Sequence, residues 1–250
     1  MRRAWSIGLL LLAGCASVPE PDVRNVEALY RAAQQAYEQR EDALAQKWLE
    51  IIRTQYPASQ YAADALLLLA DLRFRRGEYV MAAFLYQQFR QVYPQSPNAR
   101  YALFRLGQAY VELSPPYDRD QEYTYKALQA LEEFRQLYPR DSLVGKVEEQ
   151  IRALRTKLAQ RDYSIAQLYR KLQSPESALI YYDAVIEQYS DTDFAELAHV
   201  GKIEALMELQ RWDEAQRAVE AYWRLFPQGA QRRVVEAIAS LLGHARGAAP

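Results

Sequence analysis

The chain has 250 residues, of which 50% are hydrophobic and 25% charged, so it can bury a core, and its net charge of −1 gives no overall field that would recruit nucleic acid. Two histidines and one cysteine exclude a Cys/His zinc site, a disulfide framework and the usual Cys/His nucleophile pair. The nine glycines form no phosphate-binding loop or dinucleotide fingerprint, so we expect neither a cofactor nor a metal.

Residues 1–14 have the pattern of a secretory signal. Arg2 and Arg3 precede an apolar run, Ala4–Leu12, that is too short to span a bilayer. The run ends in Leu12-Ala13-Gly14-Cys15, which resembles the bacterial lipobox; the alternative is an ordinary signal peptide with a chance cysteine. The resemblance implies that Cys15 carries the covalent lipid and becomes the first mature residue. More than one acyl chain would anchor the protein stably.

Ala16 follows the cysteine, where an aspartate marks inner-membrane retention in many lipoproteins, so the resemblance implies the periplasmic face of the outer membrane. Residues 15–23 contain Pro19 and Pro21 and show no helical pattern, which indicates the lipidated cysteine and a short tether. Beyond them, the pattern predicts helices over residues 25–39, 42–55, 59–76, 78–92, 98–113, 121–137, 141–171, 176–188, 192–209, 213–225 and 231–242. We expect Ser59, just after Pro57, to be the N-cap of the third helix.

Five copies of one pattern organise residues 24–246. Each copy ends in an aromatic residue followed by an anchor residue, and the anchors are Pro57, Pro94, Pro139, Ser190 and Pro227. Proline ends a helix because it has no amide hydrogen and biases the preceding residue away from helical backbone. Twelve residues before each anchor stands an alanine, small enough to admit a neighbouring helix: Ala45, Ala82, Ala127, Ala178 and Ala215.

Apolar residues stand eight and five positions before each anchor: Leu49, Tyr86, Leu131, Tyr182 and Val219, then Ile52, Phe89, Phe134, Val185 and Tyr222. Their spacing from the alanine places them on one helix face, which we expect to be core. One helix pair cannot bury such a face, but stacked pairs can.

The pattern resembles the tetratricopeptide repeat (TPR), which also separates its alanine and proline by twelve residues. The third copy carries the first-helix signature Leu106-Gly107-Gln108-Ala109-Tyr110. The predicted fold is therefore all-α, a TPR solenoid of five helix pairs, and the wider anchor spacing between Pro94 and Ser190 predicts insertions in the third and fourth repeats.

The insertion in the third repeat narrows the resemblance. The loop Asp118-Arg119-Asp120-Gln121, followed by Leu158-Ala159 and Tyr163-Ser164-Ile165-Ala166-Gln167-Leu168-Tyr169, is similar to the BamD family, the TPR lipoproteins of the outer-membrane β-barrel assembly machine. The resemblance covers the lipobox, the five repeats and both insertions. It implies a scaffold rather than an enzyme.

The same resemblance implies the partners. The N-terminal repeats, about residues 24–140, would hold the C-terminal β-signals of unfolded outer membrane proteins. The C-terminal repeats, about residues 141–246, would dock on the periplasmic domains of a BamA-like barrel assembly protein, and other assembly lipoproteins could join. Where the family commonly has a docking arginine in the fourth repeat, this chain has Tyr181 and Tyr182.

A TPR array presents positions 2, 5, 9 and 12 of its first helices in a concave groove. The residues that we expect to bind a peptide there are Tyr30, Gln34, Tyr37, Leu67, Asp71, Phe74, Tyr101, Phe104 and Gln108. Aromatic rings would take the apolar side chains of an extended peptide, and amides would bond its backbone. The alternative is that Tyr30, Tyr37 and Phe74 only shield neighbouring helices.

Three other features have a plain structural interpretation beside a functional one. The two carboxylates and the arginine of Asp118–Gln121 could suggest acid–base catalysis, but such a loop more often makes caps and surface ion pairs, with Asp120 as an N-cap. His199 has no second imidazole at ligand spacing. The basic run on the long helix (Arg152, Arg155, Lys157 and Arg161) is expected to be a solvated face, or to dock an acidic partner.

Two other functions remain open from the residues alone. One is a TPR lipoprotein that coordinates peptidoglycan synthesis or recruits a periplasmic protease. The other is a helical hydrolase, against which the absence of any Ser/His/Asp arrangement argues.

Overall fold

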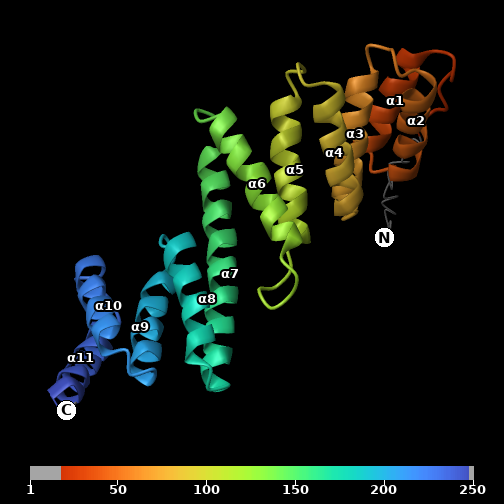
Figure 1. The fold of residues 1–250 in the computed structure, drawn as a ribbon. Coiled ribbons are helices and arrows are strands. Elements are labelled where there is room, and N and C mark those ends of the chain that lie inside the picture. The colour runs from red at the N-terminus through yellow and green to blue at the C-terminus, as the bar shows by residue number, and fades with distance from the viewer. Residues whose placement is uncertain (1–17, 248–250) are drawn as a thin grey trace, which may run out of the picture. The chain divides into compact units, whose positions relative to one another are not determined.

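The computed structural model describes residues 18–247, with side chains to residue 244, and this part of the chain contains helices and no strands (Figure 1). The helices are α1 (Val26–Glu38), α2 (Asp42–Gln55), α3 (Ala62–Arg75), α4 (Tyr79–Val92), α5 (Ala99–Leu113), α6 (Glu122–Leu137), α7 (Val144–Lys171), α8 (Pro175–Gln188), α9 (Asp193–Glu208), α10 (Trp212–Leu225) and α11 (Arg232–Gly247). Each segment expected to be helical is present, which confirms the all-α class. The expected signal peptide and Cys15 lie outside the described residues. None of the described helices combines the length and apolar character needed to cross a membrane.

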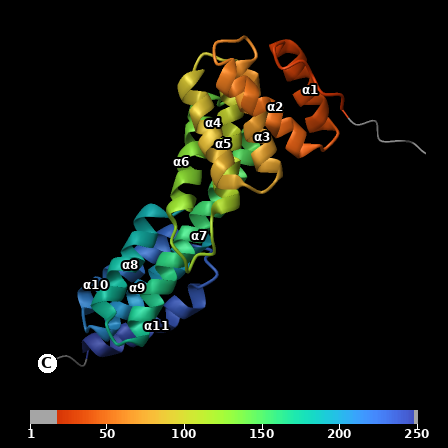
Figure 2. The same cartoon turned by 90° about the vertical axis from the view of Figure 1, so that its right-hand side faces the viewer.

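The described part of the chain divides into two compact units, and the division falls between Ser96 and Pro97. In the first unit, α1 packs on α2, α2 on α3 and α3 on α4, which makes two stacked helix pairs. In the second unit, each helix from α5 to α11 packs on the next along the chain (Figure 2). The long helix α7 lies beside α6 and α8 and also reaches α9, so it joins the third pair to the fourth.

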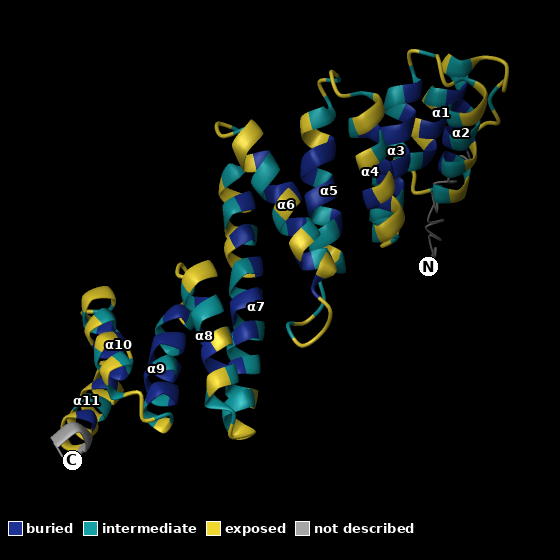
Figure 3. Ribbon diagram, in the orientation of Figure 1, coloured by how far each residue is buried: buried dark blue, intermediate teal, exposed yellow. Residues whose placement is uncertain are grey.

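The five repeat positions form the cores of both units. The five alanines that stand twelve residues before the anchors are all buried, and so are the ten apolar residues eight and five positions before them. Figure 3 shows these buried stripes on the sides of the helices that face their neighbours. The predicted helix-pair packing is confirmed.

Four of the five repeats join their two helices by the same turn. Its central residue has left-handed backbone, with φ of 64° at Arg40, 75° at Gly77, and 58° at both Gln173 and Gln210. The N–H of the next residue then bonds a carbonyl five residues earlier, as from Glu41 to Ala36 at 2.9 Å. This is the hydrogen bond of a Schellman cap, which satisfies carbonyls that the helix end leaves open. The third repeat has the inserted loop instead.

All five repeats close their second helix alike. The C-cap residues are aromatic: Tyr56, Tyr93, Tyr138, Tyr189 and Phe226. Each donates its N–H to the carbonyl four residues earlier, and its own carbonyl accepts from the N–H three residues later. Ser190 therefore serves as well as proline at its anchor. In the first repeat, the N–H of Ser59 donates to the carbonyl of Tyr56 at 3.0 Å. Ser59 thus belongs to the turn, and its expected role as N-cap is wrong, since α3 begins only at Ala62.

Candidate functional site

The loop between α5 and α6 is fastened from inside by two buried polar residues, Gln121 and Thr124, which are 3% and 0% exposed. The amide nitrogen Nε2 of Gln121 donates to the carbonyl oxygens of Pro116 at 2.8 Å and Arg119 at 2.9 Å. Its oxygen Oε1 accepts from the Thr124 hydroxyl at 2.7 Å. Gln121 therefore fixes the path of the loop main chain and leaves none of its own side-chain atoms without a partner.

A chain of hydrogen bonds continues from this amide to α7. Lys157 Nζ donates to Ser114 Oγ at 2.8 Å, and Ser114 Oγ lies 2.6 Å from Thr124 Oγ1. Since lysine can only donate and Thr124 already donates to Gln121, the Ser114 hydroxyl must donate to Thr124. Burial lowers the pKa of Lys157. The loop is thus bonded both to itself and to the long helix.

The charged residues of the Asp118–Gln121 loop point outward from this fixed main chain. Asp118, Arg119 and Asp120 are exposed. We expected Asp120 to be the N-cap of a helix that begins at Gln121, but α6 begins at Glu122 and its N-cap is Gln121. Asp120 Oδ1 still accepts a hydrogen bond from the N–H of Glu122, at 2.9 Å. Within the described residues, the side chains of Asp118 and Arg119 make no hydrogen bond or ion pair.

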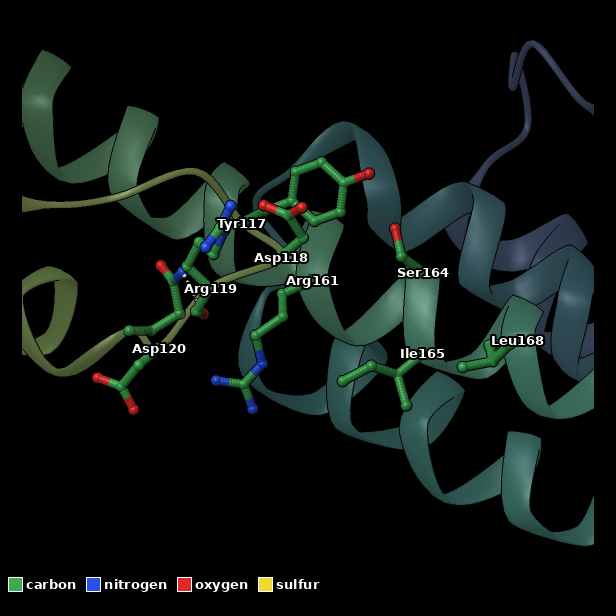
Figure 4. A pocket seen from close by; sticks show the side chains of 9 residues that line it. Tyr117, Asp118, Arg119, Asp120, Arg161, Ser164, Ile165 and Leu168 are labelled. Carbon is green, nitrogen blue, oxygen red and sulfur yellow. Dashed lines mark hydrogen bonds between the residues drawn. The ribbon is translucent and has the colours of Figure 1, made fainter.

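An open pocket of about 480 Å³ lies between this loop and α7. One face of α7 lines the pocket with Arg161, Ile165 and Leu168, which are spaced four and three residues apart. Ser164 lies beside them (Figure 4). Tyr117 and the residues Asp118–Gln121 form the opposite wall. Leu168 is 54% exposed. The pocket therefore combines an apolar stripe with charges of both signs carried on a fixed main chain, which suits the binding of another protein.

In the first unit, Tyr30 of α1 lies beside one aromatic and two polar side chains. The Tyr30 ring stacks on Tyr61 with centroids 5.2 Å apart, and its hydroxyl accepts from Gln34 Nε2 at 3.3 Å. Burial, together with the nearby carboxylate of Asp64, raises the pKa of Tyr30 to about 12, so the phenol stays protonated. Tyr61 was missed from the sequence because it lies in the turn before α3 and not at a groove position.

The other first-unit candidates also have partners within that unit. The Arg75 guanidinium lies 3.8 Å from the ring centroid of Tyr37, and Arg75 also pairs with Asp42. Phe74 packs edge-on against Tyr79, and Asp71 accepts from the Tyr86 hydroxyl. Tyr30 and Tyr37 each contact a neighbouring side chain, as the shielding alternative expects, and both residues are half-buried.

Two of the expected groove residues are core residues instead. Leu67 is only 8% exposed and Phe104 only 7%. The Phe104 ring packs on Phe134 of α6 with centroids 5.7 Å apart, so it fills the space between α5 and α6 rather than facing a groove. In the second unit, Tyr101 is 37% exposed, and the side-chain amide of Gln108 pairs with that of Gln150 at 2.6 Å.

The basic run on α7 is only partly a solvated face, because three of its four residues are half-buried and have partners. That an acidic partner docks there stays a prediction. Arg155 pairs with Asp191, which lowers the pKa of that carboxyl, and Arg161 pairs with Asp162. Lys157 bonds Ser114 as described above. Arg152 remains exposed.

The tyrosines that replace the expected docking arginine are occupied in the second unit. Tyr182 is fully buried and accepts from Gln167 Nε2 at 2.8 Å, and Tyr181 stacks on Tyr169 with centroids 5.5 Å apart. His199 is buried with its ring edge-on to Phe226 at 5.3 Å. In the part of the chain that the structure describes, no group of three or more His, Cys, Asp or Glu is placed to hold a metal ion.

The family model and the curated relatives that match this chain point to the same family of proteins. The family model described as YfiO, outer membrane lipoprotein, matches residues 22–221. The outer membrane protein assembly factor BamD of Caulobacter vibrioides is 26% identical over 211 residues, which cover 82% of this chain and 69% of that protein. BamD of Vibrio cholerae is 23% identical, with 84% and 92% covered.

Solved structures of TPR proteins are also similar to this chain. A TPR protein from Parabacteroides merdae is 17% identical, with a TM-score of 0.39, and the match covers 89% of this chain and 73% of that one. A thermophilic TPR protein of Thermus thermophilus is 20% identical, with a TM-score of 0.37 and coverage of 87% and 99%.

Proposed function

The chain belongs to the YfiO family of outer membrane lipoproteins, and on that premise we propose that it is a lipid-anchored periplasmic scaffold for the assembly of outer membrane proteins. Its relatives in Caulobacter vibrioides and Vibrio cholerae are named outer membrane protein assembly factors. Lipid on Cys15 would hold it to the periplasmic face of the outer membrane. It would act by binding and handing over its substrates, without a cofactor and without breaking bonds.

The observation that carries this proposal is the fixed charged loop beside an open apolar stripe. Gln121 holds the loop main chain, so the backbone at Asp118 and Arg119 loses little freedom when a partner binds. Preorganisation of this kind lowers the entropic cost of association. The exposed Leu168 and its neighbour Ile165 offer an apolar anchor at the centre, with charges at the rim.

The partner that we assign to this pocket is the periplasmic part of a BamA-like barrel assembly protein. It would insert an apolar side chain between Ile165 and Leu168, and its rim charges would pair with Arg119, Asp118 and Arg161. Such charged rim contacts set partner choice and association rate more than affinity.

Two half-buried tyrosines of α1, Tyr30 and Tyr37, support a second part of the proposal. Tyr30, Gln34 and Tyr37 would receive the C-terminal signal of an unfolded outer membrane protein. Aromatic rings can cover the apolar side chains of an extended peptide, while the Gln34 amide can bond its main chain.

The test is a pulldown of tagged full-length protein in mild detergent, with mass spectrometry of the chains that copurify. Two exposed leucines of the second unit provide a matched pair: Leu168→Arg in the pocket, and Leu241→Arg on α11, which is 63% exposed. We expect a BamA-like protein to be recovered with wild type and with Leu241→Arg, and to be lost with Leu168→Arg.

Two other outcomes would contradict parts of the proposal. Recovery of the barrel protein with Leu168→Arg would leave the function standing but place its docking site elsewhere. Recovery of peptidoglycan synthases or a periplasmic protease in place of the barrel protein would discard the function. Mass spectrometry of the mature N-terminus tests the anchor separately, since an unmodified Cys15 would exclude it.

A further inference from the structure

The segment that precedes α1 is fastened to the first helix pair at several points. Val18 is buried, with 6% of its surface exposed. Glu20 pairs with Lys47 of α2 at 2.8 Å. The main-chain oxygen of Val23 accepts a hydrogen bond from the Tyr56 hydroxyl at 2.8 Å. We call residues 18–24 the N-terminal clip.

The path of the clip into α1 is equally well defined. Asp22 Oδ1 accepts from the N–H of Arg24 at 3.0 Å, and the Asp22 carbonyl accepts from Asn25 at 3.0 Å. The Asn25 side chain then caps α1 through the N–H groups of Glu27 and Ala28, both at 3.1 Å. The start of the clip lines a pocket of about 390 Å³ together with residues of the first helix: Ala28, Arg31, Ala32 and Gln35. The clip therefore lies along α1 and is not a loose tether.

This attachment sets the distance between a lipid on Cys15 and the folded protein. Cys15 precedes Val18 by three residues, which span at most about 10 Å when fully extended. If the clip were released, the first fixed residue would be Asn25, and ten residues span about 35 Å. The clip thus shortens the reach of the anchor about threefold.

We propose that the N-terminal clip holds the face formed by α1 and the clip against the lipid headgroups of the membrane that carries the anchor. The inference rests on the proposed lipidation of Cys15. The occupant of this face is the bilayer surface, because a connection of about 10 Å brings the start of the clip, which lies along α1, next to the lipid. Electrostatic attraction is not the cause, since Glu20–Lys47 and Glu27–Arg31 are neutralised pairs.

The clip has a consequence for substrate capture. Tyr30 and Gln34 belong to α1, a helix of 13 residues that is about 20 Å long. A peptide bound to this helix is therefore held close to the membrane into which its own protein will be inserted.

Cysteine chemistry makes the proposal testable. Cys15 is the only cysteine in the chain, and its lipidated thiol cannot be labelled, so Gln35→Cys introduces a single reactive site beside the clip. We would label this site with a fluorophore in the full-length lipidated protein. The protein is then placed in vesicles of phosphatidylethanolamine and phosphatidylglycerol that contain a headgroup spin-labelled lipid as quencher.

Two variants lengthen the connection in different ways. Val18→Asp with Tyr56→Phe releases the clip, whereas six Gly/Ser residues inserted before Val18 lengthen the connection with the clip intact. The matched control is Val92→Asp with Tyr93→Phe, the equivalent tyrosine of the second repeat beside an exposed valine. We expect quenching at residue 35 to fall severalfold in both lengthened variants and to be unchanged in the control.

Quenching that is weak in the wild type, or that does not change on release of the clip, overturns the proposal. Mass spectrometry of each preparation separates the two ways of failing. With Cys15 acylated, such a result removes the clip proposal and leaves the proposed function intact. With Cys15 unmodified, the anchor fails and the clip proposal fails with it.

Discussion

Tyr182 of α8 lies against the main chain of α9 at Gly201. A Cβ atom at Gly201 would come within 2.5 Å of the ring carbon Cε1 of Tyr182 and 2.7 Å of its hydroxyl oxygen. Tyr182 is fully buried and bonded to Gln167, so its ring cannot easily move away. The close approach of α8 and α9 in the fourth and fifth repeats thus depends on a residue without a side chain.

Gly201→Ala should therefore destabilise the second unit by about 1–3 kcal/mol, as expected for an extra methyl group in a packed core. Gly145→Ala is the matched control, because a Cβ on this glycine of α7 would meet nothing within 4 Å. That variant should be unchanged or stabilised by up to about 1 kcal/mol. Urea denaturation measures both, and equal stabilities would show that the contact can relax.

Gln121→Ala should destabilise the protein by about 1–3 kcal/mol, because the Arg119 carbonyl oxygen loses the amide donor and the Thr124 O–H loses its acceptor. The Pro116 carbonyl keeps only its hydrogen bond from the Arg119 N–H. The substitution should also weaken binding at the pocket, since the loop loses its fixed path. Chemical denaturation and the pulldown described above measure the two effects. The exposed Gln129 of α6 is the control, and Gln129→Ala should change neither.

Arg170 joins α7 to α9 by pairing with Glu204 and Glu208, and only 22% of its side chain is exposed. Burial works against the charge, but the hydrogen bond and charge of Glu208 and the charge of Glu204 outweigh it and raise the pKa of Arg170. Arg170→Ala should cost about 2 kcal/mol, since it leaves two carboxylates together without a cation.

The control for this ion pair is the local, exposed pair Arg211–Glu214, which should contribute nothing measurable. Thermal unfolding of Arg170→Ala and Arg211→Ala provides the comparison. A similar midpoint for both variants would contradict the assigned role of Arg170.

His199 should make the stability depend on pH. Burial lowers its pKa, the charge of Lys202 adds to this effect, and the charge of Asp183 opposes it. The unfolded chain therefore binds the proton more readily than the folded one. The contribution of neutral His199 to the free energy of unfolding is fully present above about pH 6.5, and it is lost as the pH falls through the lowered pKa. His199→Leu should reduce the loss of stability between about pH 7 and about pH 5, measured by urea denaturation.

The second histidine provides the control for this measurement. His244 lies exposed on α11, and His244→Gln leaves His199 in place, so the pH dependence should remain. An unchanged slope in His199→Leu would show that other groups cause it.

Tyr30→Ala should weaken the binding of a synthetic C-terminal β-signal peptide by about tenfold, because the peptide loses an aromatic surface. Tyr30→Phe keeps the ring and should bind nearly as the wild type does. Fluorescence titration gives the affinities, and circular dichroism checks that both variants are folded. Equal affinities for all three proteins would place the peptide site elsewhere.

The repeat positions could be predicted because their cause is local and periodic. Each repeat has an alanine, two apolar residues and a final aromatic residue before the anchor, at fixed spacing. Each repeat therefore packs its helices through equivalent contacts. The helices and their pairing follow from that pattern. Ser59 was misplaced because the sequence does not show that the chain makes a full turn after Pro57 before α3 begins.

The candidate site was only partly predictable. Counting along a helix correctly placed Tyr30 and Gln34 on an accessible face, but it could not show that Phe104 fills the gap against Phe134. The Asp118–Gln121 loop was recognised by resemblance, whereas the role of Gln121 depends on carbonyls whose direction only the folded loop defines. Tyr61 has no periodic position at all, so no pattern could indicate it.

The internal hydrogen bonds of Gln121 separate what shapes the loop from what the loop displays. The amide bonds main-chain oxygens, which every residue type has, so neither Asp118 nor Arg119 is needed to keep the loop in place. Their side chains can be exchanged while the backbone path stays the same. Substitutions at these two positions can therefore change partner preference during evolution without changing the fold. The loop can thus adapt to substitutions on the surface of its partner.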